Sequence, residues 1–128
     1  MYLLDTNACI DFLIGRSRQL AERIVQERDR LSISAVSEAE LRVGSRTSTD
    51  RPGDLQRIDA FLAVLNVVAF DSRAAGVYGD LVRALGVRRS NFDRLVASHA
   101  LATGSILVTN NERDFADIPG LSVENWTR

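Results

Sequence analysis

Short apolar runs alternate with longer stretches of helical spacing along the chain. The runs are nearly continuous and span 2–4, 31–34, 66–70, 105–109 and, more weakly, 121–123; those at 66–70 and 105–109 are rich in β-branched residues. Such runs are typical of strands buried on both faces of a parallel sheet. Between them apolar residues recur every three or four positions, which predicts helices. The predicted order is β-α-α-β-α-α-β-α-α-β-short α-β, an α/β fold.

Residues that begin and end helices stand near the expected boundaries. A charged helical stretch covers 19–30, Ser72 is a candidate N-cap, and Gly86 and Gly104 lie where helices should stop. The segment 47–53 is rich in breakers and is predicted to be a loop. We expect a doubly wound α/β sandwich with right-handed crossovers.

The composition is that of an ordinary folded domain. With 128 residues, 45% hydrophobic and 26% charged, we expect a single domain over 1–128. No apolar run approaches the ~20 residues that a membrane span requires. The first residues lack the basic flank and cleavage site of a secretory signal, so we expect a cytoplasmic protein.

The scarcity of some side chains excludes several kinds of chemistry. Cys9 is the only cysteine and His99 the only histidine, which excludes an internal disulfide and thiolate-rich or histidine-rich metal sites. We expect both to be packed helical residues. All 16 basic residues are arginine, so a P-loop or any other site that needs a lysine is also excluded.

Oxygen-bearing side chains gather where the predicted strands end. Asp5 ends the first strand, Glu40 lies on the helix after the second, and Asp93 begins the helix before the fourth. Asn111 and Asp114 follow the fourth strand directly. Because sites in open α/β sheets form beyond the carboxyl ends of the strands, we expect these five side chains to meet at one edge.

Some of these acids have a competing interpretation. Asp93 could be only the N-cap of its helix, and Asp114 could only brace a turn. Glu38 and Glu40 are two positions apart on a helix, so their side chains diverge by about 200° and only one can face the site. Gly44, one turn after Glu40, leaves that face uncrowded, which favours Glu40.

The acidic cluster predicts a divalent metal site, because clustered carboxylates repel one another unless a cation lies between them. Mg²⁺ and Mn²⁺ prefer carboxylate, carbonyl and water oxygens. A bound ion of this kind lowers the pKa of a water and stabilises charge in an in-line displacement at phosphorus. That chemistry needs no His, Lys or Cys, so it fits the residue types present.

Four segments of the chain form an ordered set at the ends of the predicted elements. They are Leu4-Asp5-Thr6-Asn7, the stretch from Ile33 to Gly44 with Glu40-Leu41, the stretch 91–100 with Asp93, and 106–115 with Thr109-Asn110-Asn111. Each segment alone is a weak signal. In this order, and with the ending Glu124-Asn125-Trp126, they resemble the PIN-domain family over essentially the whole chain, and specifically its VapC toxins.

The resemblance implies a PIN-like fold, a three-layer sandwich in which helices cover both faces of a five-stranded, mostly parallel sheet. It also implies a ribonuclease that uses Mg²⁺ or Mn²⁺. Carried over by position, Asp5 and Asp93 resemble the main metal ligands, and Glu40 resembles a third acid. Asn111 departs from the commonest pattern of the family, which has Asp there. An Asn can hold a water but adds no charge, so Asp114 is the candidate for the missing charge.

The resemblance also implies partners. The substrate would be RNA, with a tRNA cut in the anticodon loop, initiator tRNA in particular, as the most specific expectation. Candidate phosphate contacts are Arg42, Arg46, Arg88 and Arg89. We further expect a homodimer, a VapB-like antitoxin that inhibits the toxin in a larger hetero-oligomer, and binding to DNA only through that antitoxin.

Rival classes fit less well. A receiver domain and a haloacid-dehalogenase-like phosphatase both need a lysine, which the chain lacks. A catalytically inactive PIN fold that binds RNA or protein stays open because of Asn111. Metal-dependent cleavage of RNA distinguishes that binding module from an enzyme.

Overall fold

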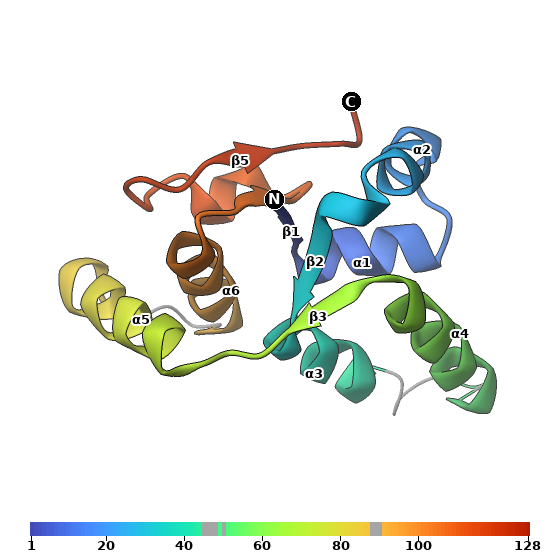
Figure 1. The fold of residues 1–128 in the computed structure, drawn as a ribbon, viewed down its shortest axis with the longest axis horizontal. Coiled ribbons are helices and arrows are strands. Elements are labelled where there is room, and N and C mark those ends of the chain that lie inside the picture. The colour runs from blue at the N-terminus through green and yellow to red at the C-terminus, as the bar shows by residue number, and fades with distance from the viewer. Residues whose placement is uncertain (45–48, 50, 88–90) are drawn as a thin grey trace.

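The structure is a computed structural model that describes residues 1–44, 49, 51–87 and 91–128. Five strands form one sheet in the order β3-β2-β1-β4-β5, and every neighbouring pair is parallel. The strands are β1 (Tyr2–Leu4), β2 (Leu31–Ser34), β3 (Asn66–Val68), β4 (Ile106–Val108) and β5 (Val123–Glu124). The strand order runs in opposite directions from β1, so the predicted doubly wound α/β sheet is confirmed (Figure 1).

Helices cover both faces of this sheet (Figure 1). They are α1 (Thr6–Leu13), α2 (Arg18–Gln26), α3 (Ala35–Gly44), α4 (Arg51–Val64), α5 (Ser72–Leu85) and α6 (Asn91–Thr103), with the 3₁₀ turns η1 (Arg28–Arg30) and η3 (Glu112–Phe115). Within the described ranges, no helix is long and apolar enough to cross a membrane.

Successive residues of each strand point into different halves of the core. Leu4 and Val108 pack in an apolar cluster with α1, α2 and α4, which also contains the fully buried Cys9. Their neighbours Leu3 and Leu107 pack in a second cluster with α5 and α6. This alternation explains why the strands read as continuous apolar runs, since both of their faces are covered.

Several predicted boundaries were wrong. The N-cap of α5 is Asp71 rather than Ser72, because the Asp71 carboxylate accepts the N–H of Ala74 at 3.0 Å. The last strand is 123–124, not 121–123. Of the predicted loop 47–53, residues 51–53 already belong to α4, whose first turn tolerates a proline.

Other boundaries came out closer to the prediction. The stretch 19–30 is helical only to Gln26 and then tightens into η1. The predicted stops at Gly86 and Gly104 are confirmed. Their φ angles of +84° and +64° are backbone conformations that glycine adopts without strain.

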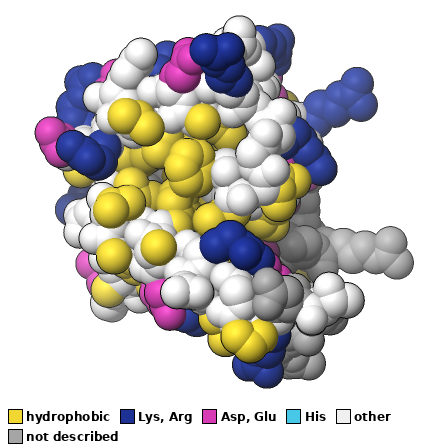
Figure 2. Space-filling model, turned by 90° about the vertical axis from the view of Figure 1, so that its right-hand side faces the viewer, with side chains coloured by type: hydrophobic (Ala, Val, Ile, Leu, Met, Phe, Trp, Pro, Cys, Tyr) yellow, Lys and Arg dark blue, Asp and Glu magenta, His cyan; other side chains and the backbone are white. Residues whose placement is uncertain are grey.

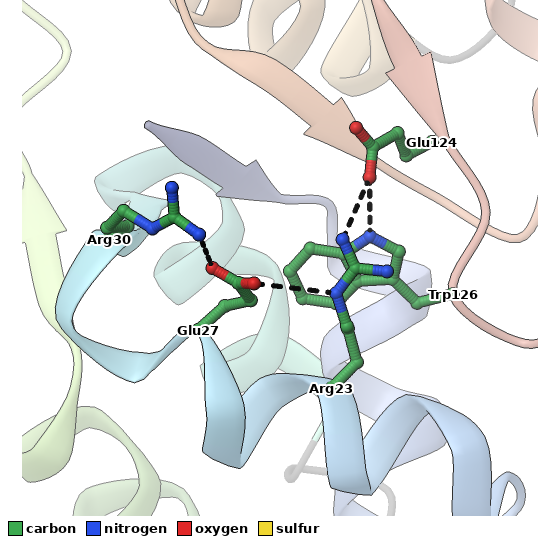
Figure 3. Close-up of polar contacts among 5 residues, drawn as sticks. All are labelled: Arg23, Glu27, Arg30, Glu124 and Trp126. Carbon is green, nitrogen blue, oxygen red and sulfur yellow. Dashed lines mark hydrogen bonds and ion pairs between the residues drawn. The ribbon is translucent and has the colours of Figure 1, made fainter.

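Trp126 fastens the C-terminal segment to α2 (Figure 3). Its indole is buried, lies 5.0 Å from the ring of Tyr2, and donates from Nε1 to Glu124 Oε1 at 2.9 Å. The guanidinium of Arg23 lies 4.8 Å from the centre of the indole and pairs with both Glu124 and Glu27. The indole of Trp126 therefore packs the C-terminal segment against Tyr2 and Arg23.

We expect Trp126→Ala to lower the free energy of unfolding by about 3–5 kcal/mol, because it removes a buried indole and leaves a cavity. Glu124→Gln is the matched control: its amide oxygen can still accept from the indole, and loss of a half-exposed ion pair costs less than about 1 kcal/mol. Chemical denaturation of both variants measures the difference. Equal effects would show that the ion pair, rather than the indole, holds the segment.

Candidate active site

Asp5 is held firmly at the end of the central strand. Its N–H donates to Val108 O at 3.0 Å, which continues the pairing of β1 with β4. Its Oδ1 accepts the N–H of Ala8 at 2.7 Å and so caps α1. The hydroxyl of Thr109 also donates to this carboxylate, and only 3% of Asp5 is exposed. The side chain therefore has one well-defined position.

The ionised form of Asp5 is disfavoured. Burial raises the pKa of Asp5 from its ordinary value of 3.8 to about 7, and the charges of Asp93 and Glu40 add to this effect. The hydrogen bonds from Thr109 and Ala8 oppose it. Burial also raises the pKa of Glu40, and the charge of Asp93 raises it further. These shifts show that the three acids lie close enough to repel one another.

Glu40, and not Glu38, faces the site. Thr6 Oγ1 donates to Glu40 Oε1 at 2.6 Å and also lies 3.1 Å from Ser37 Oγ, so this contact joins α3 to the first turn of α1. Glu38 pairs instead with Arg42 at 2.9 Å on the same helix. Of the two acids, Glu40 is therefore the one directed toward α1, as helical geometry predicted; its role in the site stays a prediction. The hydroxyls of Thr6 and Ser37 were missed, because only the folded chain shows what they contact.

Asn111 and Asp114 contact each other at the start of η3. Asn111 Nδ2 donates to Asp114 Oδ2, and the N–H of Asp114 donates to Asn111 O at 3.1 Å. The N–H of Asn111 donates to Thr109 Oγ1 at 3.0 Å, and Thr109 in turn holds Asp5. Thr109 is therefore the link between this turn and the buried acid, a role that the sequence did not suggest.

Asn110 makes a second contact that holds the same loop in place. Its Nδ2 donates to the buried carboxylate of Asp11 on α1, which also pairs with Arg16 at 3.3 Å. This contact spans almost the whole chain and fixes the exit of β4 against α1. It was also missed, because Asp11 reads as an ordinary helical residue.

The remaining candidates are Asp93 and the four arginines predicted to contact phosphate. Asp93 lies in the first turn of α6, two residues after the helix begins, so it is not the N-cap. The guanidinium of Arg42 is engaged by Glu38 and, at 3.1 Å, by Asp59 of α4. Arg46, Arg88 and Arg89 lie outside the described residues, so phosphate binding by these arginines stays a prediction.

His99 is a packed residue, as expected. It is buried, its Nδ1 lies 2.8 Å from Ser34 Oγ, and its ring meets Phe70 edge-on at 5.4 Å. Burial lowers the pKa of its imidazole, which favours the neutral form. From α6, its ring therefore points into the sandwich toward Ser34 of β2.

The donor set fits a hydrated divalent ion. Among the described residues, no three Asp, Glu, His or Cys side chains lie close enough together to cage a metal. Mg²⁺ does not require such a cage, because it usually keeps several waters and binds through one or two carboxylates. Asp5, whose pKa is raised beside two other acids, offers the hard oxygen ligand that such an ion prefers.

Comparison with known proteins agrees with the fold. The family model described as PIN domain matches residues 2–121. The chain is 32% identical to the tRNA(fMet)-specific endonuclease VapC of Salmonella typhimurium and 34% identical to the ribonuclease VapC2 of Rickettsia felis. The alignments cover 98% and 100% of this chain, and 97% and 99% of the relatives. The chain belongs to the VapC family of PIN-domain ribonuclease toxins.

Solved structures of this family superpose closely on the fold. The DNA-bound VapBC of S. typhimurium gives a TM-score of 0.91 at 31% identity, covering 98% of this chain and 97% of that one. VapBC2 of R. felis, bound to a fragment of its promoter, gives 0.88 at 32% identity and covers 98% of both chains. Both are complexes of toxin–antitoxin systems of the VapBC type.

In the metal-free protein, ionisation of Asp5 should destabilise the fold. Because the folded-state pKa is raised, the stabilising neutral form is fully present below about pH 4 and is lost as the pH rises through about 7. Asp5→Asn can still cap α1 through its amide oxygen. It should therefore exceed the wild type in stability near pH 8 by up to about 4 kcal/mol, and match it near pH 4. Thermal unfolding in the presence of a chelator measures this difference. A stability difference that does not change with pH would show that ionisation of Asp5 is not its cause.

Proposed function

We propose that this chain is the toxin of a VapBC pair, an endoribonuclease that hydrolyses RNA phosphodiesters with Mg²⁺ or Mn²⁺. The observation that carries the proposal is the buried Asp5 carboxylate, whose pKa is raised to about 7 beside Asp93 and Glu40. A bound divalent cation would relieve the repulsion among these acids. The family to which the chain belongs supports ribonuclease activity.

Each acid would have a distinct part in this reaction. Asp5 and Asp93 would hold the ion, with Glu40 as a third acid kept in place by Thr6. When bound, the ion supplies charge stabilisation at the phosphate and activates a water for attack. Asn111 and Asp114 hold each other at the edge of the site and orient waters there without forming the primary ligand set.

A tRNA is the favoured substrate, since one relative is a tRNA(fMet)-specific endonuclease. The acids lie at the sheet edge, beyond the ends of β1 and β4, where an unpaired loop can approach. Bases in an anticodon loop are unstacked and can be splayed apart, unlike those of an RNA helix. We therefore propose cleavage in the anticodon loop, with initiator tRNA as the first substrate to test.

An apolar groove beside the acids is the proposed site of the antitoxin. It has a volume of about 510 Å³ and lies between α1, α3 and α4; its lining includes Ile10, Leu13, Ile14, Leu41, Ile58 and Glu40. Figure 2 shows that hydrophobic side chains gather on the side of the molecule that bears α1, α2 and α4 in Figure 1. An exposed apolar patch of this kind marks an interaction site.

The position of Glu40 in the groove connects antitoxin binding to inhibition. A segment of a VapB-like antitoxin lying there could bring an arginine to the carboxylates, which attract a cation whenever metal is absent. We propose a toxin homodimer that assembles with this antitoxin into a larger complex. The complex, rather than the toxin alone, would bind promoter DNA, since a net charge of −1 gives this chain little general affinity for DNA.

Removal of either main acid should abolish cleavage. Asp5→Asn and Asp93→Asn should each lower the rate by more than about 100-fold, beyond the loss typical of an outer-shell residue, whereas Asn111→Ala should cost less. The products should carry a 5′ phosphate and a 3′ hydroxyl, because water rather than the ribose 2′ hydroxyl attacks. Time courses of tRNA cleavage with Mg²⁺ measure the rates, and end-mapping of the products identifies their termini.

Two results would contradict this mechanism. Cyclic 2′,3′-phosphate ends would show attack by the ribose hydroxyl. A folded wild-type chain that binds tRNA but cleaves it at no concentration of Mg²⁺ or Mn²⁺ would favour the inactive binding module instead.

A charge in the groove should prevent neutralisation without affecting catalysis. Ile14, at the end of α1, is 59% exposed, so Ile14→Asp should leave the fold intact and weaken antitoxin binding by about 10-fold or more. Val87→Asp is the matched control, because Val87 is 68% exposed and does not line the groove. Titration of RNA cleavage with the antitoxin compares them; equal inhibition of both variants would place the antitoxin elsewhere.

A further inference from the structure

A buried arginine lies next to the candidate metal ligand Asp93. Arg94 on α6 is only 3% exposed, and its Nη2 donates to Asp117 Oδ2 at 3.1 Å. Its Nε and Nη1 are also buried and have no hydrogen-bond partner among the described residues. Buried charged donors without partners destabilise a fold, and an apolar side chain of similar size is often better tolerated. Arg94 is therefore a side chain that folding alone does not explain.

The ion pair of Arg94 joins two segments that carry candidate site residues. Arg94 belongs to α6, which carries Asp93, while Asp117 follows η3, whose first residues carry Asn111 and Asp114. The two segments lie side by side in Figure 1 and also pack through apolar side chains. Apolar contacts permit small shifts, whereas a directed ion pair fixes one arrangement.

We propose that Arg94 is a positioning residue for the proposed ribonuclease site, on whose function this inference rests. It does not touch substrate or metal. Its pairing with Asp117 sets the distance between Asp93 on α6 and the Asn111–Asp114 turn, so that both face the same ion and phosphate. The chain keeps a poorly satisfied buried charge because the alignment of the acids depends on it.

Stability separates this role from a purely structural one. Arg94→Met removes the unpaired donors and leaves Asp117, which is partly exposed and can be solvated, so the melting temperature should be unchanged or higher. Asp117→Ala leaves the buried guanidinium without its carboxylate, so the melting temperature should fall. Arg94→Lys should restore the ion pair and with it much of the lost activity.

Activity should move in the opposite direction to stability. In Arg94→Met we expect kcat on tRNA to fall by about 10- to 100-fold with little change in KM, and Mn²⁺ to bind about 10-fold more weakly. Arg18→Met is the matched control, because Arg18 pairs with Glu22 on the exposed face of α2, and it should match the wild type in both measurements.

Hydrogen exchange gives a readout that needs no activity. The amides of Asp114 and Ile118, bonded to Asn111 O and Phe115 O, should exchange faster in Arg94→Met while the global stability is retained. Unchanged exchange, or a fall in melting temperature with kcat intact, would overturn the positioning role. If the wild type itself neither binds Mn²⁺ nor cleaves RNA, the proposed function fails, and the exchange data still decide whether Arg94 aligns the two segments.

Discussion

A carboxylate buried at the end of the central strand is the constraint around which the acidic edge is organised. Asp5 continues the pairing of β1 with β4, caps α1 and receives the Thr109 hydroxyl, so strand, helix and loop all depend on one side chain. Burial raises the pKa of the same group, and the charges of two further acids nearby add to this effect. The side chain that orders this edge of the sheet is therefore also the one whose ionised form is disfavoured.

This combination links the stability of the chain to the cations it meets. Whatever binds the folded protein but not the unfolded chain stabilises it by mass action. A divalent ion relieves the repulsion among Asp5, Glu40 and Asp93, and an arginine from an antitoxin would relieve the same repulsion. Under the proposed function, activation by metal and inhibition by a protein partner would compete for the same acids, one of which, Glu40, lines the apolar groove.

The sequence predicted the parts of this site that follow from local geometry. Continuous apolar runs gave the parallel strands and so the edge at which Asp5 stands, and the 200° between Glu38 and Glu40 selected the acid that faces α1. Side chains whose role depends on tertiary contact were not predictable. Thr109 and Arg94 were missed for that reason, and the N-cap at Asp71 was missed because the adjacent Ser72 is an equally good cap.

The acids come from separate elements, and this explains why they do not converge into a cage. Asp5 is fixed by β1, Glu40 by α3 and Asp93 by α6, so the distances among them are set by helix packing rather than by local turns. Carboxylates that repel one another settle apart, and a hydrated ion can bridge them where a bare one would not. Contacts that hold one element against another, such as Asp11 with Asn110 and Arg94 with Asp117, then determine the geometry of the site as much as the ligands do.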